Sequence, residues 1–291
     1  MGFPADVGIV DLMVGLPPEP GDMSWREAFR PMLKDRESLE GFQHPASYMF
    51  KNLPDERFTE DPVNAILGAM DRYGVEVAMI GVKADGPLAL GAVRDHPDRF
   101  VGSIDVDPNA GVAGLRVLRH AVEELGVKAA SGMPSGTFPQ RPADDAAWYP
   151  IYATCAELGI PIFLCMGVPG PRVPFAPQHV ERLDRVCYEF PELTIVTRHG
   201  CEPWEALAVK LMLKWPNLYY STSAFAPKYY PKAIIDYANT RGADKVMYAG
   251  YFPFGLSYET IFSQLPNLPL RDHVWPKFLR ENARRVLGLG D

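Results

Sequence analysis

The sequence has no excess of positive charge, no long apolar run and no leader-like start. Its 29 lysines and arginines are outnumbered by 36 aspartates and glutamates, which gives a net charge of -7. An acidic chain repels the phosphates of nucleic acids and of anionic membranes, so we expect neither partner. No apolar stretch approaches the ~18 residues that a membrane-spanning helix needs. The first residues lack a basic region followed by an apolar run, so we expect no signal peptide and a cytoplasmic location.

Cysteines are also few, and they lack the spacing of a metal site. The four of them show neither a C-x-x-C pair nor a zinc-finger pattern; they are Cys155, Cys165, Cys187 and Cys201. In a chain of 291 residues they are expected to be reduced thiols and not a disulfide framework. No G-x-G-x-x-G follows the first apolar segment, which argues against a dinucleotide-binding sheet.

What the sequence does contain is a regular alternation of apolar, β-branched segments with helical patterns. The predicted strands cover residues 7–14, 75–82, 100–106, 127–130, 160–166, 194–197, 218–223 and 245–249. Near-continuous apolar strands that alternate with helices indicate a parallel sheet. Eight such units predict an α/β fold, a (β/α)8 TIM barrel that forms one domain over residues 1–291. An open, doubly wound sheet is the alternative.

Residues 16–60 interrupt this rhythm as an insertion after the first strand. They are rich in proline, glycine and charge, with one short helix expected near residues 25–34. Part of the insertion carries large apolar side chains that the barrel core does not need: Trp25, Phe29, Met32, Leu33, Leu39, Phe42, Tyr48, Met49 and Phe50. Such side chains either cover a pocket as a lid or bury against a partner. We expect a homodimer in which this segment contributes to the pocket entrance.

Several predicted strands end abruptly in polar or unusual residues followed by glycine or proline. The clearest case is TIVTRHGCEPW at residues 194–204, where β-branched residues stop at Arg198-His199-Gly200. Residues 8–16, 160–170 and 245–255 have the same form. The carboxyl ends of barrel strands carry the functional groups of this fold. We therefore predict that these four ends face one pocket.

Short segments along the chain resemble those of one known family. They are AMDRYGV at 69–75, HPDRFVG at 96–102, YATCAELGIP at 152–161, PNLY at 216–219 and ENARRVL at 281–287. In this order they resemble the amidohydrolase-related proteins (amidohydrolase 2) of the decarboxylase branch. That branch includes aminocarboxymuconate semialdehyde decarboxylase and the resorcylate decarboxylases. The resemblance covers residues 8–289 and implies a TIM barrel with a catalytic divalent metal.

The metal-ligand positions that this resemblance implies carry other residues here. The family uses His-x-His after strand one, one His after each of strands five and six, and one Asp after strand eight. The corresponding residues are Met13 and Gly15, then Cys165, then Arg198 with His199 one residue on, and finally Tyr251. Zinc needs three or four converging donors, and an arginine repels a cation. We therefore predict no metal and no other cofactor.

Four residues are predicted to be catalytic: Arg198, His199, Asp11 and Tyr251. Arg198 either grips a carboxylate or oxyanion, or pairs with Asp11 across the barrel mouth. His199 either moves a proton or points to the opposite face of its strand and packs in the core. Asp11 is a second candidate for proton transfer, although the family usually uses it structurally. Tyr251 either donates to a substrate oxygen or fills space.

A second group of residues is predicted to bind the substrate: Met13, Lys128, Cys165, Ser221, Ser223 and Phe252. Lys128 is expected to end strand four, and the two serines share one face of strand seven. Methionine and phenylalanine side chains suit an aromatic or alicyclic ligand. Cys165 needs an activating base to act as a nucleophile and is otherwise a small buried filler.

Together these features predict a metal-independent enzyme that acts on a small carboxylated, ring-containing or acyl substrate. It is either a decarboxylase-like lyase, which breaks a C–C bond, or a hydrolase. The alternative is a non-catalytic ligand-binding or assembly subunit derived from a metal-dependent amidohydrolase. Met13, Gly15 and Tyr251 favour that alternative because they are chemically unlike the ligands they replace.

Overall fold

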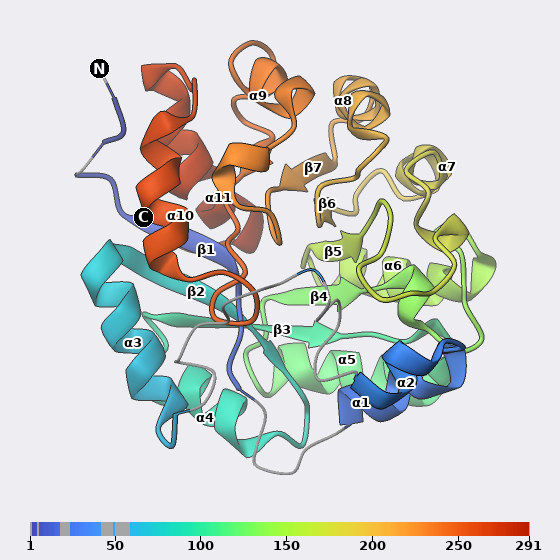
Figure 1. Ribbon diagram of the computed structural model, residues 1–291. Helices are drawn as coiled ribbons and strands as arrows, with labels where there is room; N and C mark the ends of the chain where they lie inside the picture. Colours follow the sequence, from blue (N-terminus) through green and yellow to red (C-terminus); the bar gives the residue numbers. More distant parts are fainter. Residues whose placement is uncertain (1, 5, 18–23, 42–48, 50–58, 291) are drawn as a thin grey trace.

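The computed structural model describes residues 2–4, 6–17, 24–41, 49 and 59–290. Eight strands form one parallel sheet in the order β1 to β8, wrapped into a nearly closed barrel (Figure 1). The strands are β1 (Ile9–Val14), β2 (Val75–Val82), β3 (Phe100–Asp105), β4 (Ala129–Gly132), β5 (Ile162–Cys165), β6 (Ile195–Arg198), β7 (Leu218–Ser221) and β8 (Val246–Met247). The predicted TIM barrel is thereby confirmed.

Helices surround this sheet on its outer side (Figure 1). They are α3 (Pro62–Tyr73), α4 (Pro87–Asp95), α5 (Gly111–Glu123), α6 (Tyr149–Glu157), α7 (Arg182–Glu189), α8 (Glu205–Lys214), α9 (Lys232–Ala238), α10 (Tyr258–Gln264) and α11 (Asn282–Leu287). Helix α3 shows how the sequence sets such bounds. The Asp61 side chain accepts a hydrogen bond from the backbone N of Asn64 (3.2 Å), and Gly74 ends the helix at φ 71°.

Side chains of each strand alternate between two apolar clusters. One cluster lies inside the barrel and includes Val77 and Met79 of β2, and Val101 of β3. The other lies between the sheet and the helices and includes Ile80 of β2 and Ile104 of β3. Because successive side chains point to opposite faces, this alternation also fixes which residues point into the barrel mouth at the carboxyl ends.

The barrel closes between its first and last strands by a few specific bonds. Val14 and Phe252 form an isolated parallel bridge, and the Gly15 N–H donates to the Phe252 carbonyl (2.8 Å). The Asp11 carboxylate accepts from the backbone N of Gly250 at 2.7 Å. A side chain therefore takes part in a junction where strand pairing is sparse.

The described part of the insertion after β1 contains two short α-helices, α1 (Ser24–Phe29) and α2 (Arg36–Gly41). Only one helix, over residues 25–34, was expected there. Arg172, in the loop after β5, pairs with Asp35 (2.7 Å) and Glu37 (2.8 Å) of the insertion. A Cβ added at Gly136, after β4, would lie 3.2 Å from the Phe29 ring. The insertion thus contacts loops at the carboxyl ends of its own barrel strands, as a lid would.

The apolar side chains of this insertion differ in their exposure to solvent. Met32 and Leu33 are buried, whereas Leu39 and Met49 are exposed. The Trp25 side chain and residues Phe42, Tyr48 and Phe50 lie outside what the structure describes. A contact of this segment with a second copy of the chain therefore stays a prediction.

Near the end of the chain, one predicted helix is present and another was missed. The helix expected over residues 271–287 is continuous from Asp272, with a tight turn at Asp272–Val274, a wide turn at Lys277–Glu281 and α11 at its end. Helix α10 was missed; its start is capped by Ser257, whose Oγ accepts from the backbone N of Thr260 (3.1 Å).

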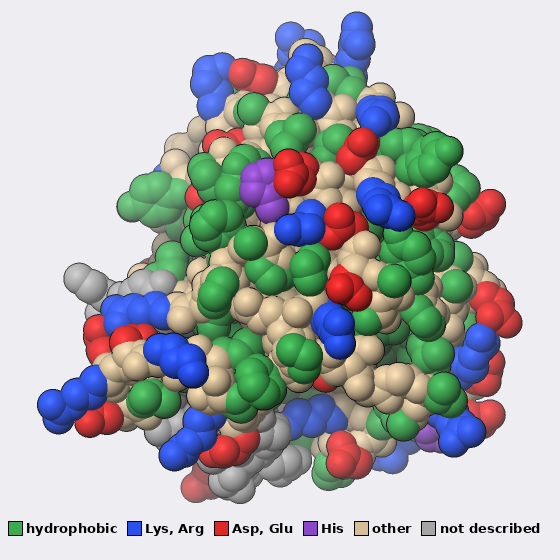
Figure 2. Space-filling model, turned by 90° about the vertical axis from the view of Figure 1, so that its right-hand side faces the viewer, with side chains coloured by type: hydrophobic (Ala, Val, Ile, Leu, Met, Phe, Trp, Pro, Cys, Tyr) green, Lys and Arg blue, Asp and Glu red, His purple; other side chains and the backbone are tan. Residues whose placement is uncertain are grey.

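The surface carries charges of both signs. On the face drawn in Figure 2, acidic and basic side chains are interspersed, with hydrophobic ones scattered between them. Within the described part of the chain, no helix combines the length and apolarity that crossing a membrane requires.

Candidate active site

Polar side chains gather where the inward face of the barrel meets the carboxyl ends of the strands. The alternation places Asp105 at the end of β3, Cys165 at the end of β5 and Arg198 at the end of β6 on this face. Lys83, just after β2, and Tyr251, after β8, continue it. We call these five residues the strand-end cluster. The four strand ends predicted to share a pocket supply three of them; β2 and β3 add the other two.

Arg198 is the buried cation of the cluster. It is only 8% exposed, and its Cζ lies 5.0 Å from the centre of the Phe163 ring. Its buried Nε has no hydrogen-bond partner, and among the described residues none bonds to its guanidinium. Burial lowers the pKa of Arg198, an effect that Cys165, Asp105 and Tyr251 partly offset. A desolvated guanidinium without a partner is suited to bind an anion.

Asp105 and Lys83 are functional candidates that the sequence reasoning missed. Val82 of β2 pairs with Ile104 of β3, so the next residues, Lys83 and Asp105, end adjacent strands side by side. Burial raises the pKa of Asp105, although the charges of Arg198 and Lys83 act in the opposite direction. The sequence did contain a sign of this position. Asp105 comes two residues after Ser103, and residues two apart in a strand lie on the same face.

His199 lies beside the cluster and is held by Ser223. Its backbone N–H donates to the Ser223 Oγ (3.1 Å), and this hydroxyl lies 3.2 Å from Nδ1 of the ring. Because Ser223 Oγ accepts from the backbone, its own proton is free to go to Nδ1, which leaves the ring proton on Nε2. Burial and the charge of Arg198 lower the pKa of His199 to about 3, so the ring is neutral at pH 7.

The chain after β6 adopts a rare backbone conformation. His199, Gly200 and Cys201 have φ values of 62°, 86° and 61° in succession. Left-handed conformations are unfavourable for residues with a Cβ and concentrate at functional sites. This turn takes His199 out of the extended alternation, so its ring packs edge-on against Tyr251 (centroids 5.8 Å apart). The expectation that His199 points away from the pocket face assumed a regular strand.

The Asp11 side chain points to the junction between β1 and β8, which we call the barrel seam. Its Oδ1 accepts from the backbone N atoms of Gly250 (2.7 Å) and Met13 (3.0 Å). Its Oδ2 lies within 3.4 Å of the Tyr248 hydroxyl and 3.2 Å of the Tyr258 hydroxyl. Burial raises the pKa of Asp11 to about 6 despite these four bonds. The pairing of Asp11 with Arg198 that we considered is therefore not what the structure shows.

The remaining predicted binding residues divide between the mouth and other places. Cys165 pairs in register with Arg198 and is buried, which raises the pKa of its thiol to about 12 and favours the role of inert filler. Met13 packs against the inner cluster. Ser221 donates its hydroxyl proton to the Thr197 carbonyl (2.8 Å) on the neighbouring strand.

Two predicted binding residues lie away from the cluster. Lys128 precedes β4, which begins at Ala129, so it lies at the amino end of the strand and not at its carboxyl end. Phe252 follows the inward-facing Tyr251 and therefore points outward, where it stacks on Tyr258 (4.1 Å between ring centres). The prediction for Lys128 assigned it to the wrong end of its strand, and the prediction for Phe252 assigned it to the wrong face. Each error arises from a shift of one or two residues.

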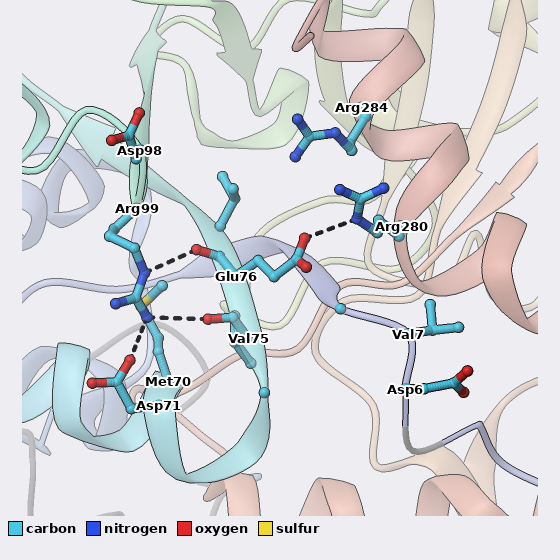
Figure 3. A pocket seen from close by; sticks show the side chains of 13 residues that line it. Asp6, Val7, Met70, Asp71, Val75, Glu76, Asp98, Arg99, Arg280 and Arg284 are labelled. Atoms are coloured by element: carbon cyan, nitrogen blue, oxygen red, sulfur yellow. Dashed lines mark hydrogen bonds and ion pairs between the residues drawn. The ribbon is translucent and has the colours of Figure 1, made fainter. Parts of the chain in front are cut away.

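A cavity of about 640 Å³ lies at the opposite, amino end of the barrel (Figure 3). Its charged walls are largely paired: Arg99 contacts Asp71 (2.7 Å) and Arg280 contacts Glu76 (2.8 Å). In this fold the amino end stabilises the barrel and the carboxyl end carries the chemistry. We therefore place the candidate site at the strand-end cluster.

Comparison with known proteins agrees with this architecture. A family model described as amidohydrolase matches residues 25–289. The chain belongs to the amidohydrolase family. No curated protein matches the sequence of this amidohydrolase.

Solved structures share the fold over nearly the whole chain. An uncharacterised TIM-barrel protein, Bb4693 from Bordetella bronchiseptica, is 21% identical with a TM-score of 0.71, covering 97% of this chain and 99% of its own. The 5-carboxyvanillate decarboxylase LigW from Sphingomonas paucimobilis is 16% identical, with a TM-score of 0.71 and the same coverage. A dihydroxybenzoic acid decarboxylase from Polaromonas sp. JS666, solved with manganese and 2-nitroresorcinol, is 17% identical with a TM-score of 0.67 and 97% coverage of both chains.

The residues of this amidohydrolase do not fit the metal that the family resemblance implies. A Cβ at Gly15 would lie 2.0 Å from the Phe254 ring, so this ring fills the space of a ligand side chain there. Cys165 remains a thiol beside the cationic Arg198. Across the described ranges, no group of three or more His, Cys, Asp or Glu side chains is arranged to hold an ion.

Proposed function

We propose that this amidohydrolase is a decarboxylase-like lyase that acts on small carboxylated ring compounds without a metal. The observation that carries the proposal is the Arg198 guanidinium, which is 8% exposed and whose buried Nε has no partner. A carboxylate that accepts two parallel N–H bonds is the anion that best matches this planar donor.

The surroundings of Arg198 support a ring-bearing acid. Arg198 is a buried cation at the mouth, with Lys83 on the same face, and such a cation attracts an anion. Phe163 stacks under the guanidinium, and Met13 adds apolar surface. Two of the structural neighbours are named as decarboxylases of hydroxylated aromatic acids, which suggests that compound class.

The charges in the cluster support metal independence. In a metal-dependent site a divalent cation neutralises developing negative charge. Here Arg198 and Lys83 supply fixed positive charge at the strand ends, and a nearby metal would be repelled by both. Preorganised cations of this kind stabilise developing anions without an ion.

A panel of acids tests the function. The purified chain is incubated with dihydroxybenzoates, 5-carboxyvanillate and alicyclic acids, and CO₂ release, hydrolysis products and thermal stabilisation are measured with and without EDTA. We expect CO₂ release from at least one hydroxylated aromatic acid, unchanged by EDTA. Hydrolysis without CO₂ would replace the lyase by a hydrolase. Stabilisation without turnover across the panel would indicate a binding subunit. Activity that EDTA abolishes and one metal ion restores would overturn metal independence alone.

We also propose a homodimer in which the insertion after β1 borders the pocket entrance. The exposed Leu39 and Met49 supply apolar surface in this segment. Light scattering at micromolar protein is expected to give twice the chain mass. A monomer mass would leave the segment as a lid only, consistent with its ion pairs between Arg172 and the insertion residues Asp35 and Glu37.

A further inference from the structure

Asp105 has a position that the proposed carboxylate binding does not by itself require. It ends β3 on the inward face, inside the barrel mouth, where neighbouring residues surround it although part of its surface stays open to solvent. No described residue makes a hydrogen bond or a close ion pair with its carboxyl group. The charges that face it are Lys83 after β2 and Arg198 on β6, with the Cys165 thiol on β5. An acid held among cations without a hydrogen bond is not a structural ion pair.

The barrel wall beside Asp105 has a position that described side chains leave unfilled. Gly81 of β2 pairs with Ser103 of β3 on the same inward face. Gly81 is exposed although it belongs to a barrel strand, one residue before the end of β2, and no described atom lies within 4 Å of where its Cβ would be. A glycine at this position leaves a gap on the barrel wall next to Asp105, where a bulkier residue would project into the mouth.

Three other titratable groups near the mouth are poorly suited to deliver a proton. His199 is neutral at pH 7 and accepts the Ser223 hydroxyl proton at Nδ1. The buried Cys165 thiol has a pKa raised to about 12. Asp11 is bonded at the seam with Gly250 and Met13. Burial raises the pKa of Asp105, so its carboxyl group keeps its proton to a higher pH than an ordinary aspartate does.

We propose that Asp105 is the catalytic acid of this enzyme and delivers the proton that replaces the departing carboxylate. The inference rests on the proposed decarboxylase function. Arg198 and Lys83 hold the substrate carboxylate, and the carbon that bears it lies over the gap at Gly81, facing the Asp105 carboxyl group.

The step balances without any further reactant than water. The substituted ring carbon takes the Asp105 proton, using a π electron pair of an electron-rich ring. The bond from that carbon to the carboxylate then breaks, its electron pair returns to the ring, and neutral CO₂ leaves. Asp105 regains a proton from water, and the hydroxide formed combines with CO₂ as bicarbonate. The net reaction converts one carboxylate and one water into the ring compound and bicarbonate.

The test compares Asp105→Asn with a matched control at the other end of the same strand, Asp98→Asn. Asp98 is exposed and precedes β3 at the amino end of the barrel. With the acid that the parent turns over best, Asp105→Asn is expected to lose at least about a hundredfold in kcat, the usual contribution of a positioned acid. Its affinity for that acid is expected to stay equal when Asp105 is protonated, and to rise at higher pH, where the parent carries a negative charge at this position and the variant does not. Asp98→Asn is expected to match the parent.

The pH profile and a conservative variant add independent readouts. Because the protonated acid is the active form, parent turnover is expected to fall as pH rises through the raised Asp105 pKa, and this limb is expected to vanish in Asp105→Asn. Asp105→Glu keeps a carboxyl group and is expected to recover part of the lost turnover. If Asp105→Asn kept kcat within threefold of the parent with the same pH profile, the proposal would be wrong.

Failure of this proposal is distinguishable from failure of the proposed function. If the parent releases CO₂ and Asp105→Asn does so equally well, the lyase stands and another group donates the proton. If the parent releases no CO₂ from any acid, the function itself fails, and with it the role of Asp105. Melting temperatures of both variants are expected to equal that of the parent, since Asp105 makes no bond among the described residues that asparagine would break.

Discussion

Replacing Arg198 with methionine is expected to lower kcat/KM for the best acid by at least about a hundredfold, because the substrate carboxylate loses its charge-assisted donors. Methionine keeps much of the side-chain volume and the contact with Phe163. The fold is expected to survive, since the mutation removes a buried cation whose Nε has no partner. The free energy of unfolding is expected to stay equal or to increase, as is common when a buried functional group that lacks a partner is replaced by an apolar side chain.

Two further arginine variants sharpen this prediction. Arg198→Lys keeps the charge but loses the planar fork, so an intermediate loss of activity is expected. Arg280→Met removes an arginine at the amino end of the barrel, which is paired with Glu76 at 2.8 Å. It is expected to keep full activity and to change stability by less than about 1 kcal/mol. Unchanged kcat/KM in Arg198→Met would rule out Arg198 as the carboxylate-binding group.

Replacing Asp11 with alanine is expected to lower the free energy of unfolding by about 3 to 5 kcal/mol relative to Asp11→Asn. Alanine leaves the backbone N–H groups of Gly250 and Met13 without the acceptor they share. Asparagine keeps it, because both of these bonds go to Oδ1, while the tyrosine hydroxyls lie on the Oδ2 side and can accept from an amide. Chemical denaturation of the two variants at one pH measures the difference.

The same pair of variants yields a pH dependence with a defined sign. The pKa of Asp11 is raised by burial from 3.8 to about 6, so between these values the folded state holds more protons than the unfolded state. The contribution of Asp11 to stability is therefore present below about pH 4 and falls as pH rises to about 6, by about 3 kcal/mol in all. Asp11→Asn is expected to lack this fall and to be at least as stable as the parent at pH 7.

Turnover of Asp11→Asn separates the two roles that the sequence left open for this residue. If Asp11 only closes the seam between β1 and β8, Asp11→Asn is expected to keep turnover close to that of the parent. A loss as large as that expected for Asp105→Asn would instead assign proton transfer to Asp11.

Much of the fold was predictable because local sequence carries it. Apolar, β-branched segments form strands wherever helices can cover one face, and their even spacing fixed the barrel and its direction. The polar ends of β5, β6 and β8 were also visible, so Cys165, Arg198 and Tyr251 were placed at the mouth correctly in position. Helix α10 was not predicted, since its pattern is short and its capping is local.

The individual roles at the site were harder to predict, because they depend on partners far away in the chain. The Gly250 N–H that binds Asp11 is 239 residues distant, and the Ser223 hydroxyl that orients His199 is 24 residues distant. Lys128 and Phe252 were misplaced by small errors in position along their strands. A shift of one residue moves a side chain to the other face of the sheet, and an error in a short strand's bounds moves a residue from one end to the other.

The sequence by itself determined that this chain is a barrel with polar strand ends and with unusual residues at the family's ligand positions. Only the tertiary structure decided which of these polar groups meet. It placed Asp105 and Lys83 beside Arg198 and directed Asp11 to the seam. The physical reason is that periodicity along one strand fixes a side chain's face, whereas its neighbours on that face come from other strands, brought together by the register and closure of the barrel.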